Sequence, residues 1–141
     1  MKKLLTATLL TLMLSENLFA QVKHYKFKGY DAYHTRESVL EFTISDDGAI
    51  KGSQKISKVC TSNAHLAGGN LKLVGYLTGS YPQVTGTFKG IAKQCGGKET
   101  PEKGTFKMGY HPQFGVFVQL FNAWGTGVEY YHKDPHKNPF K

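Results

Sequence analysis

The sequence lacks any long hydrophobic run. Its longest apolar stretch, at 4–14, is too short to cross a bilayer, which takes about 20 apolar residues in a helix. Lys2 and Lys3 precede this stretch, and Ala20 follows it after a short polar break. This order is typical of a cleaved secretory signal peptide of the bacterial type. We therefore expect residues 1–20 to be removed and the mature protein to be periplasmic or secreted; a buried N-terminal helix is the alternative.

Cysteine is scarce, since the chain has only Cys60 and Cys95. Neither follows the expected cleavage site directly, so an acylated N-terminal cysteine is excluded. We expect no lipid anchor and no membrane span in the mature chain. Two cysteines in an oxidising compartment pair by default, which predicts a Cys60–Cys95 disulfide. Two free thiols are the alternative.

Acidic residues are few. The chain has 10 Asp and Glu against 18 Lys and Arg, a formal net charge of +8 with histidine neutral. Removing the signal takes away two lysines and one glutamate and leaves +7. A basic protein favours anionic partners: acidic polysaccharide, lipid headgroups or an acidic protein, with nucleic acid not expected after export. The alternative is a surface that merely keeps the protein in solution, and the scatter of lysines along the chain favours it.

Catalytic and metal-binding motifs are missing. No G-x-S-x-G signature is present, and the glycine pairs at 68–69 and 96–97 precede no helix that could bind a phosphate. The 6 histidines do not combine with acids or cysteines in a known ligand pattern. We therefore expect a non-enzymatic protein with no cofactor and no metal. A small hydrolase is a third possibility, and it would need a histidine and an acid to converge on a nucleophile or water.

Helical periodicity is absent after the signal, and strand periodicity takes its place. In one segment Leu40, Phe42 and Ile44 alternate with polar residues, which is the pattern of a half-buried strand. Turn signals such as Asp46-Asp47-Gly48 separate such segments. The predicted strands are 22–30, 37–45, 49–57, 70–79, 84–93, 103–110, 114–121 and 124–132.

Short connections between these strands favour an antiparallel meander. Glycines inside strands permit the bends that curl a sheet closed. The glycines expected to face inward are Gly52, Gly75, Gly86, Gly90 and Gly104. We therefore predict an all-β fold: one domain at 21–132, an eight-stranded up-and-down β-barrel wide enough for packed side chains or one small ligand. A two-sheet β-sandwich is the alternative, and a flexible tail rich in proline and lysine follows at 133–141.

In such a meander all odd-numbered strands end at the same rim, so both cysteines lie there. The long connections predicted at 31–36, 58–69 and 94–102 gather at this rim too, and loops at a barrel mouth commonly carry the binding site. This predicts a site for a small or anionic ligand in an exported binding protein. The candidate residues are Tyr30, Asp31, Tyr33, His34, Arg36, Lys58 and His65.

The last two strands carry more aromatic residues than one inner face can take. Phe117 and Phe121 are expected outside, beside Tyr131, with Glu129 also facing outward. Contiguous outward aromatic side chains often mark an interface, which predicts the alternative function of a protein–protein interaction or assembly factor. These side chains could instead lie under the tail if Phe140 folds back.

Overall fold

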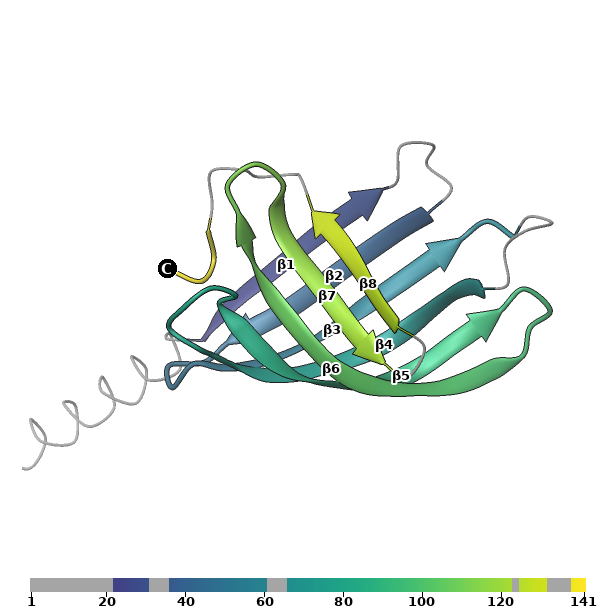
Figure 1. The fold of residues 1–141 in the computed structure, drawn as a ribbon, viewed down its shortest axis with the longest axis horizontal. Helices are drawn as coiled ribbons and strands as arrows, with labels where there is room; N and C mark the ends of the chain where they lie inside the picture. The colour runs from purple at the N-terminus through teal and green to yellow at the C-terminus, as the bar shows by residue number, and fades with distance from the viewer. Residues whose placement is uncertain (1–21, 31–35, 61–65, 123–124, 132–137) are drawn as a thin grey trace, which may run out of the picture.

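Eight strands form the described part of the molecule (Figure 1). The computed structural model describes residues 22–30, 36–60, 66–122, 125–131 and 138–141. The strands are β1 Lys23–Tyr30, β2 Arg36–Ile44, β3 Ala49–Lys58, β4 Leu66–Leu77, β5 Val84–Gln94, β6 Glu99–His111, β7 Gly115–Asn122 and β8 Gly125–Tyr131. They make one antiparallel sheet in the order β1 to β8, without a helix among the described residues. The predicted all-β meander is confirmed, and the sandwich is not formed.

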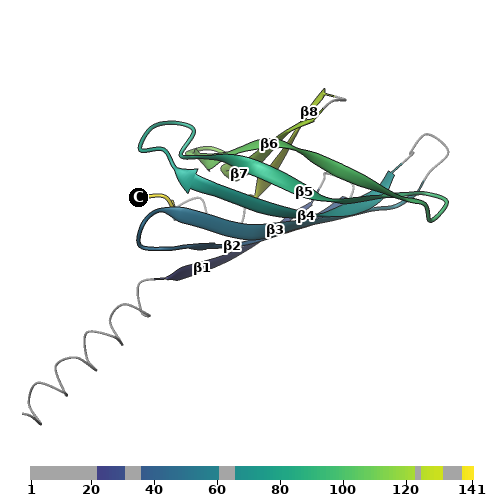
Figure 2. The same cartoon turned by 90° about the horizontal axis from the view of Figure 1, so that it is seen from below.

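The sheet curls into a half-barrel that stays open, which corrects the expected closure (Figures 1 and 2). Strands β1 and β8 are each paired on one side only. Their edges approach at one point, where a Cβ on Gly29 would lie 3.0 Å from the carbonyl oxygen of Tyr130 and 3.2 Å from the Tyr131 ring. Because Gly29 is near the end of β1 and Tyr131 ends β8, the two described strands meet only at their ends and form no ladder.

Glycines allow the close strand contacts that bend the sheet. A Cβ on Gly86 would lie 2.1 Å from a β4 carbonyl oxygen and 2.7 Å from the Phe106 ring. Gly86 lies opposite Phe106, and Gly104 lies opposite Phe88 on the same pair of strands. Each large ring therefore occupies the space that a glycine leaves, as expected for inward-facing glycines in a curled sheet.

The core lies on the inner, concave face. Its fully or nearly fully buried side chains are Leu40, Phe42, Ile44, Ile50, Leu71, Leu73, Val84, Phe88, Phe106, Met108, Val116, Val118 and Tyr131. The end of the chain adds to this core, since the Phe140 ring stacks on Phe42 with the ring centroids 5.8 Å apart. Of the segment predicted to be a flexible tail, residues 138–141 are described, and they lie against the half-barrel.

Strands β5 and β6 run further than predicted, so the long connection expected at 94–102 is wrong. The ladder continues through Lys93 opposite Glu99, and the backbone N–H of Gln94 donates to the carbonyl of Lys98 at 2.8 Å. The segment contains Pro101, and proline is uncommon inside a strand. That proline is tolerated because β7 pairs with β6 only from Thr105 onward, so β6 is an edge strand at Pro101.

The disulfide is confirmed at the predicted rim. Cys60 follows β3, Cys95 follows β5, and their Cα atoms lie 5.7 Å apart. The bridge thus joins the ends of two strands that flank β4.

Candidate functional site

The predicted mouth residues lie mostly outside the part of the chain that the structure describes. Asp31, Tyr33, His34 and His65 are outside it, and Tyr30 and Arg36 are placed only as the end of β1 and the start of β2. Arg36 pairs in register with Lys58, the last residue of β3, whose side chain is half-buried. The backbone therefore brings these two basic positions together near the disulfide, and a site at this mouth stays a prediction.

The outer face of β3–β6 carries a concentration of positive charge. Seven lysines face outward on these four strands, all exposed, and we call this surface the lysine face: Lys51, Lys55, Lys72, Lys89, Lys93, Lys103 and Lys107. Glu99 is the one acidic residue that shares it. None of the seven forms an ion pair with another described residue. Lysines that are scattered along the chain are therefore gathered in space by the strand register.

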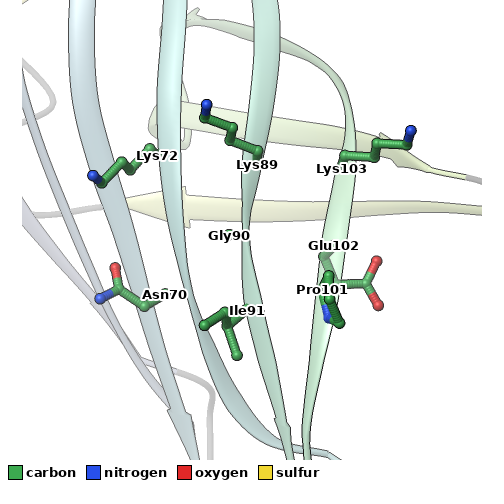
Figure 3. A pocket seen from close by; sticks show the side chains of 8 residues that line it. All are labelled: Asn70, Lys72, Lys89, Gly90, Ile91, Pro101, Glu102 and Lys103. Carbon is green, nitrogen blue, oxygen red and sulfur yellow. The ribbon is translucent and has the colours of Figure 1, made fainter.

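Three of these lysines form a row across the middle of the sheet. Lys72 lies directly opposite Lys89, and Lys89 lies directly opposite Lys103 (Figure 3). Like charges directly opposite one another destabilise an antiparallel pair, by up to about 1 kcal/mol each. The register thus places three lysines side by side on adjacent strands, and a bound anion would offset their repulsion.

An open groove of about 670 Å³ runs along this row. The next row of its lining consists of Asn70, Ile91 and Pro101, again from β4, β5 and β6 (Figure 3). Glu102 also borders the groove, and its carboxylate accepts a hydrogen bond from the Asn122 side-chain amide at 3.5 Å. The groove therefore combines three lysines with a row of one polar and two apolar residues, and Glu102 lies at its border.

On the first two strands of the sheet, charged residues of both signs share the outer face. On β1 and β2, Lys26 lies opposite Glu41, and the His24 ring nitrogen Nε2 lies 2.8 Å from a Glu41 carboxylate oxygen. A lysine and a glutamate therefore face each other across this strand pair. The like-charged row on β4–β6 is a local feature of the molecule, because the outer face of β1–β2 mixes both signs.

An aromatic surface is present on the outer face of β7 and β8, as predicted, but Tyr130 takes the place of Tyr131 in it. Phe117 lies opposite Tyr130, so Tyr131 points inward and is 1% exposed. The placement of Tyr131 and Glu129 on the outer face is therefore wrong. The ladder between β7 and β8 begins with Asn122 opposite Gly125. This register determines which β8 side chains face inward, and it leaves Glu129 buried at 8% exposure.

The outer aromatic cluster, as we call this surface, is centred on Phe117. Its ring centroid lies 5.9 Å from that of Tyr81 and 6.2 Å from that of Tyr130, which in turn lies 5.3 Å from Phe114. Tyr81, Phe114 and Tyr130 are 64%, 38% and 41% exposed, whereas Phe117 is nearly buried beneath them. Phe121 lies apart from this cluster, half-buried, with the Lys107 ammonium 5.4 Å from its ring centroid.

The described residues contain no group of three histidine, cysteine or acidic side chains that could hold a metal ion. In the same ranges no helix is long and apolar enough to cross a membrane. Of the 6 histidines, His34, His65, His132 and His136 lie outside these ranges.

Comparison of the chain with models of protein families, with curated proteins and with solved structures found no match in any of the three.

Proposed function

We propose that this protein acts by binding, without catalysis, and that its ligand is an anion held on the lysine face. The observation that carries the proposal is the row of Lys72, Lys89 and Lys103, opposite one another on adjacent strands. Each repulsive pair lowers the stability of the free sheet, and a multivalent anion would convert the repulsion into attraction. The proposal keeps the anionic ligand expected from the sequence and places its main site on the outer face of the half-barrel.

Export is part of the same proposal. The disulfide is compatible with an oxidising compartment. We infer that the segment at 1–20 directs the chain to the periplasm or the medium.

Titration calorimetry with inorganic tripolyphosphate tests the site. We expect binding that weakens as salt is added and that falls about fivefold in Lys89→Gln, the middle of the row. Lys26→Gln is the matched control, because it removes the same charge from β1 at a position opposite Glu41. Equal weakening in both variants would show a response to net charge alone and would refute the site.

A second candidate function is association with another protein through the outer aromatic cluster. Its support is the group of exposed rings of Tyr81, Phe114 and Tyr130 around a nearly buried Phe117. Exposed aromatic groups of this kind favour protein interfaces. Native mass spectrometry tests it, with Tyr130→Lys as the variant, since the buried Phe117 would unfold the sheet if charged. A complex that persists in Tyr130→Lys would exclude this surface.

A further inference from the structure

The lysine face also exposes apolar side chains between its charges. Ile91, Val74 and Tyr76 are 44%, 50% and 60% exposed on β4 and β5. Ile91 lies one row from Lys89 on β5, and Val74 lies one row from Lys72 on β4. Each of these side chains exposes apolar area to water, which an apolar layer of a partner would cover.

These side chains lie on the outer side of the middle strands of the sheet. Strands β4 and β5 are the middle strands of the sheet, and the sheet curls toward its inner face, so they form the summit of the convex side (Figure 1). A large partner on this side of the sheet would therefore contact β4 and β5, where the lysine row and the apolar side chains are combined.

We propose that the lysine face docks on an anionic lipid bilayer. This inference rests on the proposed function, because it names the lipid headgroup as the source of the anion. The ammonium groups of Lys72, Lys89 and Lys103 contact headgroup phosphates, while Ile91 and Val74 enter the boundary between headgroups and acyl chains. Long lysine side chains suit this geometry, because their stems lie along apolar surface and their ends reach the charged layer.

Two other sources of anionic groups fit less well. Free phosphate would contact the lysines and leave Ile91 and Val74 in water. An acidic polysaccharide would offer the charge but no apolar layer. A bilayer supplies both at once, and each lysine near an anionic surface strengthens binding about fivefold.

Vesicle co-sedimentation tests the proposal. The protein is recovered as the cell processes it, and its N-terminus is read by mass spectrometry, because an uncleaved apolar run would itself enter lipid. We expect binding to phosphatidylglycerol vesicles, little binding to phosphatidylcholine vesicles, and a loss of about fivefold in Lys89→Gln. Val74→Ser, which lies outside the groove, should weaken vesicle binding severalfold and leave tripolyphosphate binding unchanged. Val128→Ser, a substitution of an exposed apolar residue on β8, is the matched control and should bind vesicles like the original protein.

The outcomes separate the two proposals. If tripolyphosphate binds at the lysine row but Val74→Ser binds vesicles normally, the lipid inference fails and the anion site stands. Equal binding to both kinds of vesicle would also overturn the lipid inference. If Lys89→Gln changes neither tripolyphosphate nor vesicle binding, both proposals fail.

Discussion

The hydroxyl oxygen of Tyr131 lies 2.6 Å from that of Ser38, although 93 residues separate the two along the chain. The contact joins β8 to β2 and passes Gly29 of β1, where the absence of a side chain makes room for the tyrosine ring. The side-chain amide of Gln54 on β3 donates to the same hydroxyl at 2.9 Å. Three buried polar groups thus tie the last strand to the first half of the sheet, where no ladder connects them.

Replacing Tyr131 with phenylalanine should therefore destabilise the protein by about 2–3 kcal/mol, because Ser38 and Gln54 would be left buried without this partner. Urea unfolding followed by fluorescence measures the change. Tyr130→Phe is the control, since that neighbouring hydroxyl belongs to an exposed ring. Similar midpoints for the two variants would mean that the buried contact does not stabilise the half-barrel.

Gly86→Ala should lower the free energy of unfolding by about 1–3 kcal/mol, because the added methyl group would overlap a β4 carbonyl and the Phe106 ring. Gly127→Ala offers a comparison within another strand, at a position where an added Cβ meets nothing within 4 Å. That variant should be as stable as the original or slightly more so. If both substitutions are neutral, close strand contact at Gly86 is not needed for the curl.

Lys89→Thr should raise stability by a few tenths of a kcal/mol, because it removes the middle charge of a like-charged row. Lys93→Thr makes the same chemical change on the same strand, but there the lysine lies opposite Glu99 and its loss should not stabilise. Added salt should shrink the difference between the two variants. A larger gain in Lys93→Thr would contradict the proposed repulsion.

The double variant Cys60→Ser/Cys95→Ser should lose about 3–4 kcal/mol, from the entropy of a chain no longer closed over a sequence separation of 35 residues. Urea midpoints with and without a reducing agent measure this. Reduction should move the original protein to the midpoint of the variant and leave the variant where it was.

Acidification should act partly through the turn between β2 and β3. The Ser45 hydroxyl and the Ala49 backbone N–H both donate to the Asp47 carboxylate and hold its pKa below the ordinary value of 3.8. A carboxylate with a lowered pKa in the folded state stabilises fully above its unfolded pKa, and this contribution is lost as the pH falls through the folded pKa. The urea midpoint should therefore fall less between about pH 6 and about pH 3 in Asp47→Asn than in the original protein. Asp46→Asn, in the same turn but outside these hydrogen bonds, should behave like the original.

The strands themselves could be predicted because period-two alternation and turn residues are local signals. The segment around Pro101 could not, since its place in β6 depends on where β7 ends, and that is a property of the sheet. The predicted inward and outward positions on β8 were wrong for a related reason. A carboxylate at Glu129 favours an outward position, but the pairing of Phe117 with Tyr130 decides which side it occupies.

The candidate site shows the same limit. Alternation along single strands already places Lys89 and Lys107 on the outer face. Predicting the lysine row also requires the strand register, that is, which residues lie opposite one another on three strands. Closure was overestimated because strand number alone cannot tell how far the two edge strands overlap. Sequence patterns thus predict each strand well, whereas the properties that depend on pairs of strands come from the register.

The contact between Tyr131 and Ser38 also sets an order of assembly. In a meander every ladder joins consecutive strands, so β1 to β7 can pair before β8 joins the sheet. The hydroxyl that joins the two halves belongs to the final residue of the last strand. A chain cut short before β8 would keep seven strands and lose this tie, so the two halves of the half-barrel are joined only after β8 has paired.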